Sequence, residues 1–352
     1  VATGRGVTPD TLFLAGSISK PVAAIGAMAL VEKGKLKLDE DVNASLKTWK
    51  VPENEYTKEQ KVTLRRLLSH MAGLTVHGFP GYAATEEVPT VRQILDGEKP
   101  ANTPAVRVNM PPGQTWRYSG GGYTVAQLMM TEAAGTTFPE FMQRAVLAKA
   151  GMKQSTYENP LPKALSSAAA TGYDAKGEAY PGRYHTYPEM AAAGLWTTAS
   201  DLARILIEMQ KSREGRANRI LKQATVEEML RVAGGHYGLG FGVMEREGLK
   251  RFSHGGADAG FQAWAMATVD GRGLVVLTNS DNGGRLANEI SLAFAAAYGL
   301  PDKPRERARI EMAAEAVAKF AGEYEAGQIG RVRSWVEGDH LVATVPQQGD
   351  FR

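Results

Sequence analysis

The sequence predicts an α/β (α+β) protein in which an antiparallel sheet, flanked by helices, lies beside an all-helical lobe. Apolar residues at helical spacing dominate the first part of the chain. A run of strand-like segments joined by tight turns follows, and a strong helix closes the main body. Strands joined by tight turns pair antiparallel, and such a sheet needs helices against it to bury its apolar face. We therefore expect two lobes within one main domain.

The composition is that of an ordinary globular protein. The chain has 352 residues, 43% of them hydrophobic and 22% charged, which is enough for a large core. A net charge of +3 with interleaved basic and acidic residues gives no reason to expect a nucleic-acid partner. Cysteine is absent, which excludes disulfides and thiol chemistry. No apolar stretch reaches membrane-span length, and no signal peptide is visible.

Helices are expected at intervals along the main domain. The first runs from about Ser17 to Lys33, because its apolar residues recur at helical spacing and Gly34 supplies a C-terminal stop. Ser200 and Asp201 are expected to cap a later helix. The remaining helices of this domain are expected at residues 62–70, 123–134, 138–149 and 287–298.

Between these helices the apolar period changes to that of β-strands. Asp270-Gly271 is a strong hairpin signal, and Gly248 offers a second turn. The strands are expected at residues 237–245, 250–254, 261–269 and 274–279. They predict an antiparallel meander that the last helix covers.

The chain is expected to divide near residue 300. Residues 1–300 form the main domain in this interpretation. Residues 301–352 form a charged, proline-bearing linker, a helix over 311–320 and the beginning of a small β unit. The strands of that unit are expected at residues 323–326, 332–337 and 341–345. This unit is too short to close a barrel, so we expect it to be either truncated or packed on the main body.

Ser17 and Lys20, at the start of the first helix, form the strongest chemical signal. Their spacing places both side chains on one face of a helix, so the lysine amine can reach the serine hydroxyl. Orphan N–H groups and the positive helix end disfavour the lysine ammonium and therefore lower the lysine pKa. Such a pair is a nucleophile with its base, without a histidine. The alternative is an ordinary helix start with a polar first turn.

Two further segments carry candidate catalytic groups. Tyr118, in a loop after a proline-rich turn, can shuttle the serine proton if it lies beside the lysine. His254-Gly255-Gly256 ends a predicted strand, where glycines let a substrate approach the backbone. The next N–H, of Ala257, can complete an oxyanion hole with that of Ser17. The alternatives are a half-buried loop tyrosine and a strand end with a bulge.

Other reaction classes find little support in the sequence. The six histidines show no ligand spacing, so no metal and no other cofactor is expected. No G-x-S-x-G elbow is present, which argues against an α/β-hydrolase. Gly120-Gly121-Gly122 lacks the lysine of a phosphate-binding loop and is better interpreted as a helix entry.

Together with residues 68–74, 194–203 and 237–240, these motifs resemble the class C β-lactamase-like serine hydrolases in content and order over about residues 8–298. That superfamily also holds family VIII carboxylesterases, D-aminopeptidases and DD-peptidases. The resemblance implies the β-lactamase/penicillin-binding-protein-like transpeptidase fold. It also implies that Ser17 is the acylated nucleophile, Lys20 its partner and Tyr118 the proton shuttle. It slightly favours export to the periplasm.

Three departures from the family pattern are visible. Family β-lactamases carry an asparagine amide where this chain has Gly120, and a lysine cation where it has His254, which is mostly neutral near pH 7. Both changes weaken β-lactam recognition and leave ester acyl transfer possible. The family's leading helix and first two strands also precede its Ser-x-x-Lys motif, whereas sixteen residues precede Ser17 here.

We therefore expect a serine hydrolase that cleaves small esters through an acyl-enzyme. A D-amino-acid peptidase or amidase, a weak β-lactamase and a catalytically silent binding module are the alternatives. The expected substrate-binding residues are His254, Gly255, Gly256, Ser119, Tyr82 and Trp196. The only expected partner is a small ester or amide substrate, and the sequence gives no oligomeric state.

Overall fold

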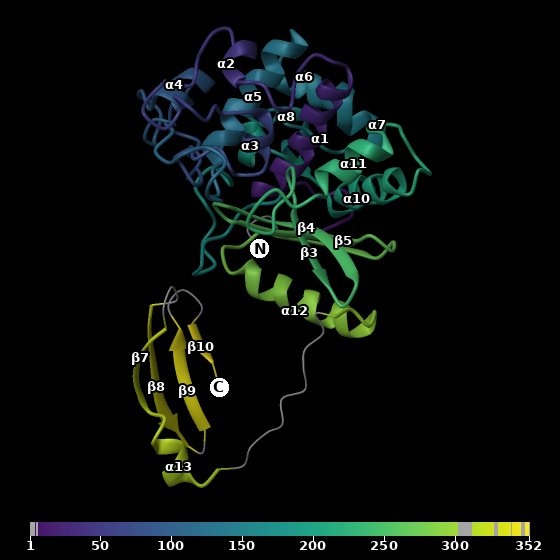
Figure 1. Ribbon diagram of the computed structural model, residues 1–352. Coiled ribbons are helices and arrows are strands. Elements are labelled where there is room, and N and C mark those ends of the chain that lie inside the picture. Colours follow the sequence, from purple (N-terminus) through teal and green to yellow (C-terminus); the bar gives the residue numbers. More distant parts are fainter. Residues whose placement is uncertain are drawn as a thin grey trace. The chain divides into compact units, whose positions relative to one another are not determined.

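The computed structural model of the chain describes residue 4 and residues 6–301, 312–326, 330–338, 340–345 and 349–351. The chain separates into two compact units, Val1–Lys303 and Pro304–Arg352. Figure 1 shows most helices of the first unit gathered on one side of its sheet, with α12 (Gly283–Ala297) on the other. Within the described ranges, every helix is too short or too polar to cross a membrane.

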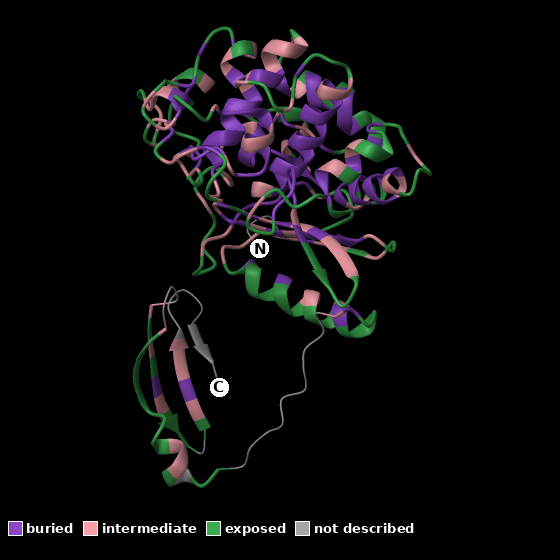
Figure 2. Ribbon diagram, viewed as in Figure 1, coloured by how far each residue is buried: buried purple, intermediate pink, exposed green. Residues whose placement is uncertain are grey.

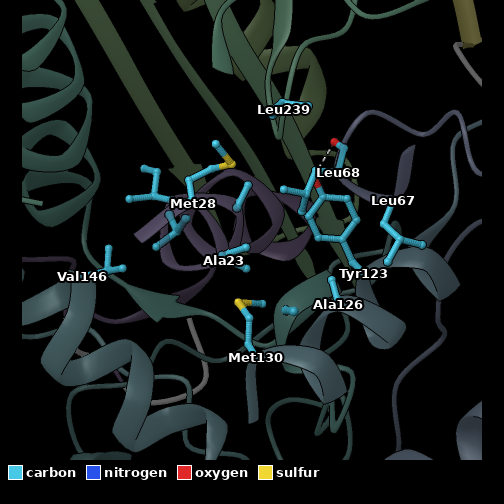
Figure 3. Close-up of a cluster of buried hydrophobic side chains, with 14 of the residues drawn as sticks. Ala23, Met28, Leu67, Leu68, Tyr123, Ala126, Met130, Val146 and Leu239 are labelled. Atoms are coloured by element: carbon cyan, nitrogen blue, oxygen red, sulfur yellow. Dashed lines mark hydrogen bonds between the residues drawn. The ribbon is translucent and has the colours of Figure 1, made fainter. Parts of the chain in front are cut away.

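Helix α1 (Ser19–Glu32) runs through the middle of the helical lobe. Nearly all of its side chains are buried, which explains why it is apolar on every side. Figure 2 shows this burial, and Figure 3 shows α1 packed against Tyr123, Met130 and Leu239. At Gly26 a Cβ atom would lie 2.6 Å from the sulfur of Met142, so glycine allows the neighbouring helix to approach closely.

The other helices of the first unit surround α1 or cover the sheet. They are α2 (Val42–Ser45), α3 (Leu64–Leu68), α4 (Val91–Asp96), α5 (Gly120–Ala134), α6 (Phe138–Met142), α7 (Ala148–Ala150), α8 (Lys163–Ser166), α9 (Met190–Ala193), α10 (Ala199–Arg213), α11 (Gln223–Met229) and α12 (Gly283–Ala297). A π-helical turn, η2 (Gln143–Leu147), interrupts the helix expected at residues 138–149.

The start of α10 differs from the prediction. Thr198, and neither Ser200 nor Asp201, is its N-cap, because the backbone of Thr198 is extended and its hydroxyl accepts the Asp201 N–H at 3.1 Å. Asp201 lies in the first turn, where its carboxylate accepts the Gln154 N–H at 2.9 Å. The cap therefore lies two residues before the expected one.

The main sheet has the order β3-β4-β5-β6 and is antiparallel throughout. Its strands are β3 (Gly242–Arg246), β4 (Leu249–Asp258), β5 (Phe261–Thr268) and β6 (Gly273–Thr278). Pairing of β3 with β4 stops at Ser253, whereas β5 pairs with β4 to its last residue. The end of β4 is therefore paired on one side by β5 and contacts the 3₁₀ turn η1 (Gly16–Ile18).

Helices α10 and α12 both pack on β5 and β6, and Figure 1 shows them on opposite faces of the sheet. The apolar alternation of β5 explains the inner face, where Phe261, Ala263 and Ala265 are buried. A two-stranded sheet that the sequence did not predict pairs β1 (Phe13–Leu14) with β2 (Trp196–Thr197). This sheet brings the residues before Ser17 beside those after α9.

The second unit is a small antiparallel sheet with a short helix. Helix α13 (Ala314–Ala318) precedes β7 (Gly322–Glu325), β8 (Arg331–Glu337), β9 (His340–Val345) and β10 (Gly349–Phe351), which pair in the order β10-β9-β8-β7. Strand β10 was not predicted. Most of the expected linker lies outside the described residues.

Candidate active site

Ser17 lies in η1, immediately before α1. Lys20, one turn further on, donates a hydrogen bond from Nζ to Ser17 Oγ at 2.9 Å and another to the carbonyl of Ala192 at 2.8 Å. Gly16 adopts a φ of +52°, a region that favours glycine, and this lets the chain turn sharply into the helix. The local sequence thus brings a hydroxyl and an amine into contact.

Lys20 is almost completely buried, with 2% of its surface exposed. Burial lowers its pKa from 10.5 to about 7, and the charge of Asp258 opposes this effect. The amine lies over the rings of Tyr118 and Tyr123, at 4.9 Å and 5.8 Å from their centroids. At neutral pH a lysine with this pKa is neutral in a substantial fraction of molecules and can then accept a proton.

Tyr118 immediately precedes the N-cap of α5 and faces Ser17. Its hydroxyl lies near Ser17, which favours the ionised phenol, but burial has the larger effect and raises the pKa of Tyr118 well above its usual value. Its ring packs against His70 at 4.2 Å and His77 at 4.9 Å between centroids. Tyr118 is therefore a neutral phenol in contact with the serine hydroxyl.

His70 holds the segment that carries Tyr118. Its Nδ1 accepts the N–H of Ser119 at 3.1 Å, so the ring proton lies on Nε2. Burial and the charge of Lys20 hold the pKa of His70 well below its usual value. The ring is consequently neutral and acts as a rigid platform beneath Tyr118.

The end of β4 lies directly against the turn that carries Ser17. A Cβ atom on Gly16 would lie 2.5 Å from the backbone nitrogen of Ala257, and one on Gly256 would lie 2.0 Å from the carbonyl oxygen of Ala15. These two segments therefore meet backbone to backbone, which requires glycine on both sides. The contact places the peptide of Ala257 beside that of Ser17.

His254 is buried, with 8% of its surface exposed, yet its side chain reaches the cavity above Ser17. Its ring lies 6.1 Å from that of Tyr118 and 5.9 Å from that of Tyr237. Burial, together with the charge of Lys20, lowers the pKa of His254 to about 3. This position therefore carries no positive charge at neutral pH.

A cavity of about 950 Å³ opens above Ser17 and continues over β4 and β5 to α12. Tyr118, His254 and the backbone of Gly255 to Ala257 lie along its catalytic end. Apolar side chains such as Trp264, Met266 and Leu292 line the far end. The cavity thus joins a polar reactive centre to a largely apolar trench.

The structure brings Ser17, Lys20 and Tyr118 together, and His254, Gly255 and Gly256 line the same cavity. Three other predicted substrate-binding residues lie elsewhere. Ser119 is buried as the N-cap of α5, where it accepts the Gly122 N–H at 3.0 Å. Tyr82 and Trp196 are each 1% exposed and pack in the interior. Large aromatics in loops near a site more often fill a core than line a pocket.

Gly120 lies where no side chain fits. A Cβ atom there would be 2.9 Å from a ring carbon of Phe79 and 3.1 Å from the carbonyl oxygen of His77. Phe79 therefore occupies the space into which a side chain at position 120 would extend. The sequence showed the missing amide but not the aromatic ring that fills its place.

Two buried acids near the site were not recognised in the sequence. Asp258 ends β4 beside Ala257, and Glu189 precedes α9, which provides the carbonyl that holds Lys20. A lone aspartate before Ala259-Gly260 has the pattern of a turn residue. Glu189 carries no local motif at all. Only tertiary packing shows that both are buried.

An antiparallel sheet beside a helical lobe, with a serine, a lysine and a tyrosine in contact where they meet, defines the class of serine hydrolases that do not use a histidine base. The comparison with protein families matches residues 1–297 to the β-lactamase family, described as "Beta-lactamase". The chain belongs to this family. The predicted fold and the predicted serine hydrolase class are thereby confirmed.

Relatives in this family carry several names. The chain is 23% identical over 348 residues to "Penicillin-binding protein 4*" of Bacillus subtilis (strain 168), covering 91% of this chain and 73% of that protein. It is 27% identical over 172 residues to "Esterase EstB" of Burkholderia gladioli, covering 46% of this chain and 42% of that protein. The name of the family therefore does not by itself give a substrate.

Solved structures share the fold. The octameric penicillin-binding protein homologue from Pyrococcus abyssi has a TM-score of 0.65 at 22% identity, covering 98% of this chain and 78% of that one. The D-amino acid amidase from Ochrobactrum anthropi SV3, in complex with L-phenylalanine, has a TM-score of 0.62 at 22% identity, with 79% of each chain covered. At this identity the likeness establishes the architecture alone.

Proposed function

We propose that the chain hydrolyses small esters through an acyl-enzyme formed on Ser17. The observation that carries this proposal is the 2.9 Å contact between Lys20 Nζ and Ser17 Oγ at the catalytic end of the 950 Å³ cavity. A hydroxyl in contact with an amine that can be neutral near pH 7 is an activated nucleophile. The esterase among the relatives supports the same reaction class.

In the acylation step, Ser17 Oγ attacks the ester carbonyl and its proton passes to Lys20, directly or through Tyr118. Lys20 is the group that stores the proton, because its pKa is about 7. Tyr118 can only relay the proton, because its raised pKa keeps it protonated. The N–H groups of Ser17 and Ala257 stabilise the negative oxygen of the tetrahedral intermediate.

Collapse of that intermediate breaks the bond to the alcohol, and the proton stored on Lys20 returns through Tyr118 to the leaving oxygen. Water then attacks the acyl carbon and gives its proton to Lys20. The acid is released as Ser17 Oγ regains a proton. The cycle is balanced by one water molecule and needs no other reactant.

The preference for esters rests on the two altered recognition positions. Gly120 presents no amide to a substrate, and Phe79 fills the adjacent space. His254 presents no cation, because its pKa is about 3. A β-lactam or an N-acyl peptide would therefore lose two polar contacts in this cavity, while a short ester requires only the nucleophile, its base and the oxyanion N–H groups.

The test is a comparison of kcat/KM for p-nitrophenyl acetate and butyrate, nitrocefin and a D-amino-acid amide in one buffer, with Ser17→Ala as the blank. We expect the two esters to be hydrolysed far faster than nitrocefin. Faster turnover of the amide would assign the chain to the amidases instead. Mass spectrometry after fluorophosphonate treatment should locate the adduct on Ser17, and an unmodified Ser17 in folded protein would contradict the proposal.

A further inference from the structure

Asp258 is a buried acid at the end of β4, one residue beyond the proposed oxyanion peptide. It is 7% exposed, and its Oδ2 has no hydrogen-bond partner. The turn that follows is held in place, since the Ala259 N–H donates to the Tyr187 hydroxyl at 2.9 Å and the Gly260 N–H donates to Asp281 at 2.7 Å. The backbone therefore fixes the carboxyl in the interior.

The Asp258 carboxyl lies beside the turn that carries Ser17, and its charge affects the protonation of Lys20. The backbone N–H of Gly16, the residue before Ser17, lies near this carboxyl and favours its ionised form. The charge of Asp258 in turn acts on Lys20, whose ammonium it stabilises. A buried ammonium without a counter-charge is costly, so the Asp258 carboxylate offsets part of the cost of burying Lys20.

Among the titratable groups that the structure describes around Lys20 and Asp258, the Asp258 carboxyl is the one that can provide a negative charge for the Lys20 ammonium. His70 and His254 are neutral, because burial and the Lys20 charge depress the pKa of each ring. The phenols nearby are kept protonated by burial. A charge on Glu189 would raise the pKa of Asp258, but burial raises the pKa of Glu189 itself to about 8, so Glu189 is mostly neutral at pH 7. The titratable groups that face the pair are Tyr118, Tyr123, Tyr187, His70, His254 and Glu189.

We propose that Asp258 is a positioning residue of this site: it lies at the end of β4 against the turn that carries Ser17, and it provides the counter-charge of Lys20. The inference rests on the proposed function, because it assigns a role toward the Ser17 nucleophile. Burial raises the pKa of the Asp258 carboxyl well above its usual value, and the Lys20 charge and the Gly16 N–H oppose this increase. The pair can therefore share one proton, which moves between the amine and the carboxyl with no change in net charge.

The experiment measures the rate of Ser17 modification by a fluorophosphonate between pH 5 and 9, so the readout does not depend on the natural substrate. Asp258→Asn is nearly isosteric and keeps a carbonyl oxygen near the Gly16 N–H, but it removes the negative charge. We expect the acid limb of the rate profile to move to lower pH by roughly one unit, because Lys20 loses the charge that favours its ammonium form.

Glu189→Gln is the matched control, since it also converts a buried acid into its amide but does not act directly on Lys20. Its acid limb should coincide with that of the wild type. Should Asp258→Asn fail to fold, Asp258→Ser removes the same charge with a smaller polar side chain.

An unmoved limb in a folded Asp258 variant, or an equal shift in Glu189→Gln, overturns the inference. Failure of wild-type Ser17 to react at any pH would instead overturn the proposed function. The two failures are therefore distinguishable.

Discussion

Lys20 Nζ donates two hydrogen bonds, one to Ser17 Oγ at 2.9 Å and one to the carbonyl oxygen of Ala192 at 2.8 Å. The amine is thus anchored by α9 and directed toward the nucleophile. A carbonyl acceptor adds no charge, so it fixes the position of the amine without the pKa increase that a carboxylate would cause. This combination explains how a buried lysine can serve as a base close to neutral pH.

The first prediction concerns the two serines of the motif. Ser17→Ala should abolish ester turnover and leave the fold intact, because it removes one oxygen that faces the cavity. Ser19 is a structural residue, since its hydroxyl donates to the Gly16 carbonyl at 2.6 Å and accepts the Leu195 N–H at 2.9 Å. Ser19→Ala should lower the free energy of unfolding by about 1–3 kcal/mol and keep most of the activity. Turnover by purified Ser17→Ala would refute the assignment of the nucleophile.

The second prediction concerns the base and the relay. Lys20→Ala and Tyr118→Phe should each slow acylation about a hundredfold or more, the usual scale for general-base catalysis. Their effects should be strongly non-additive, because both residues act on the same proton. Single-turnover kinetics of the two single variants and the double variant test this. A double variant whose loss equals the product of the single losses would indicate independent roles.

The pH dependence follows from Lys20. Its amine must be neutral to accept the serine proton, and its pKa is about 7. We therefore expect kcat/KM for p-nitrophenyl butyrate to rise with pH through an acid limb near pH 7 and then to level off. His254 cannot cause this limb, because its pKa of about 3 leaves it neutral throughout. A His254→Gln variant should keep the limb, and its loss in that variant would transfer the base assignment to the histidine.

Much of the fold followed from the sequence, because the signals involved are local. The hairpin over Asp270-Gly271 and the two-residue turn Glu247-Gly248 both occur where they were expected, since glycine readily adopts the positive φ found at Gly248 and Gly271. The pair β1–β2 was missed because each strand has two residues and pairs across a long stretch of sequence. Strand β10 was missed because it has only three residues, although it pairs with the adjacent strand β9.

The residues of the site also divide into those that local sequence signals predict and those that depend on tertiary packing. Ser17 and Lys20 are neighbours on a helix start, so spacing alone predicted their contact. Tyr118 and His254 were candidates from their local sequence, but only the resemblance to a family joined them to Ser17, since no local rule joins residues so far apart. The burial of Tyr82 and Trp196, and the presence of Asp258 and Glu189, depend on which elements pack together. Periodicity cannot show this, because each of these residues is compatible with either exposure or burial.

Position 120 supplies a prediction on substrate choice. Gly120→Asn should not create a β-lactamase, because the new side chain would collide with Phe79 and the His77 carbonyl. Overpacking of this kind typically costs about 1–3 kcal/mol, so we expect a lower melting temperature and weaker ester turnover. Combining Gly120→Asn with Phe79→Ala should restore stability in part and raise nitrocefin turnover relative to the single variant. Nitrocefin hydrolysis faster than ester hydrolysis in Gly120→Asn alone would contradict this account.

The last prediction concerns Glu189 and stability. Its side chain is fully buried, neither carboxyl oxygen has a hydrogen-bond partner, and burial raises its pKa from 4.5 to about 8. The folded protein therefore keeps a proton on Glu189 between about pH 4.5 and 8, whereas the unfolded chain releases it. Because the folded state then binds more protons, stability falls as pH rises through this window.

Glu189→Gln removes that proton linkage. Its free energy of unfolding, relative to wild type, should change little at pH 4.5 and increase by on the order of 3 kcal/mol at pH 8. Urea denaturation at several pH values measures this difference, and Glu59→Gln, at an exposed position, provides the surface control. A difference that stays constant with pH would mean that Glu189 has the same charge in the folded and unfolded states.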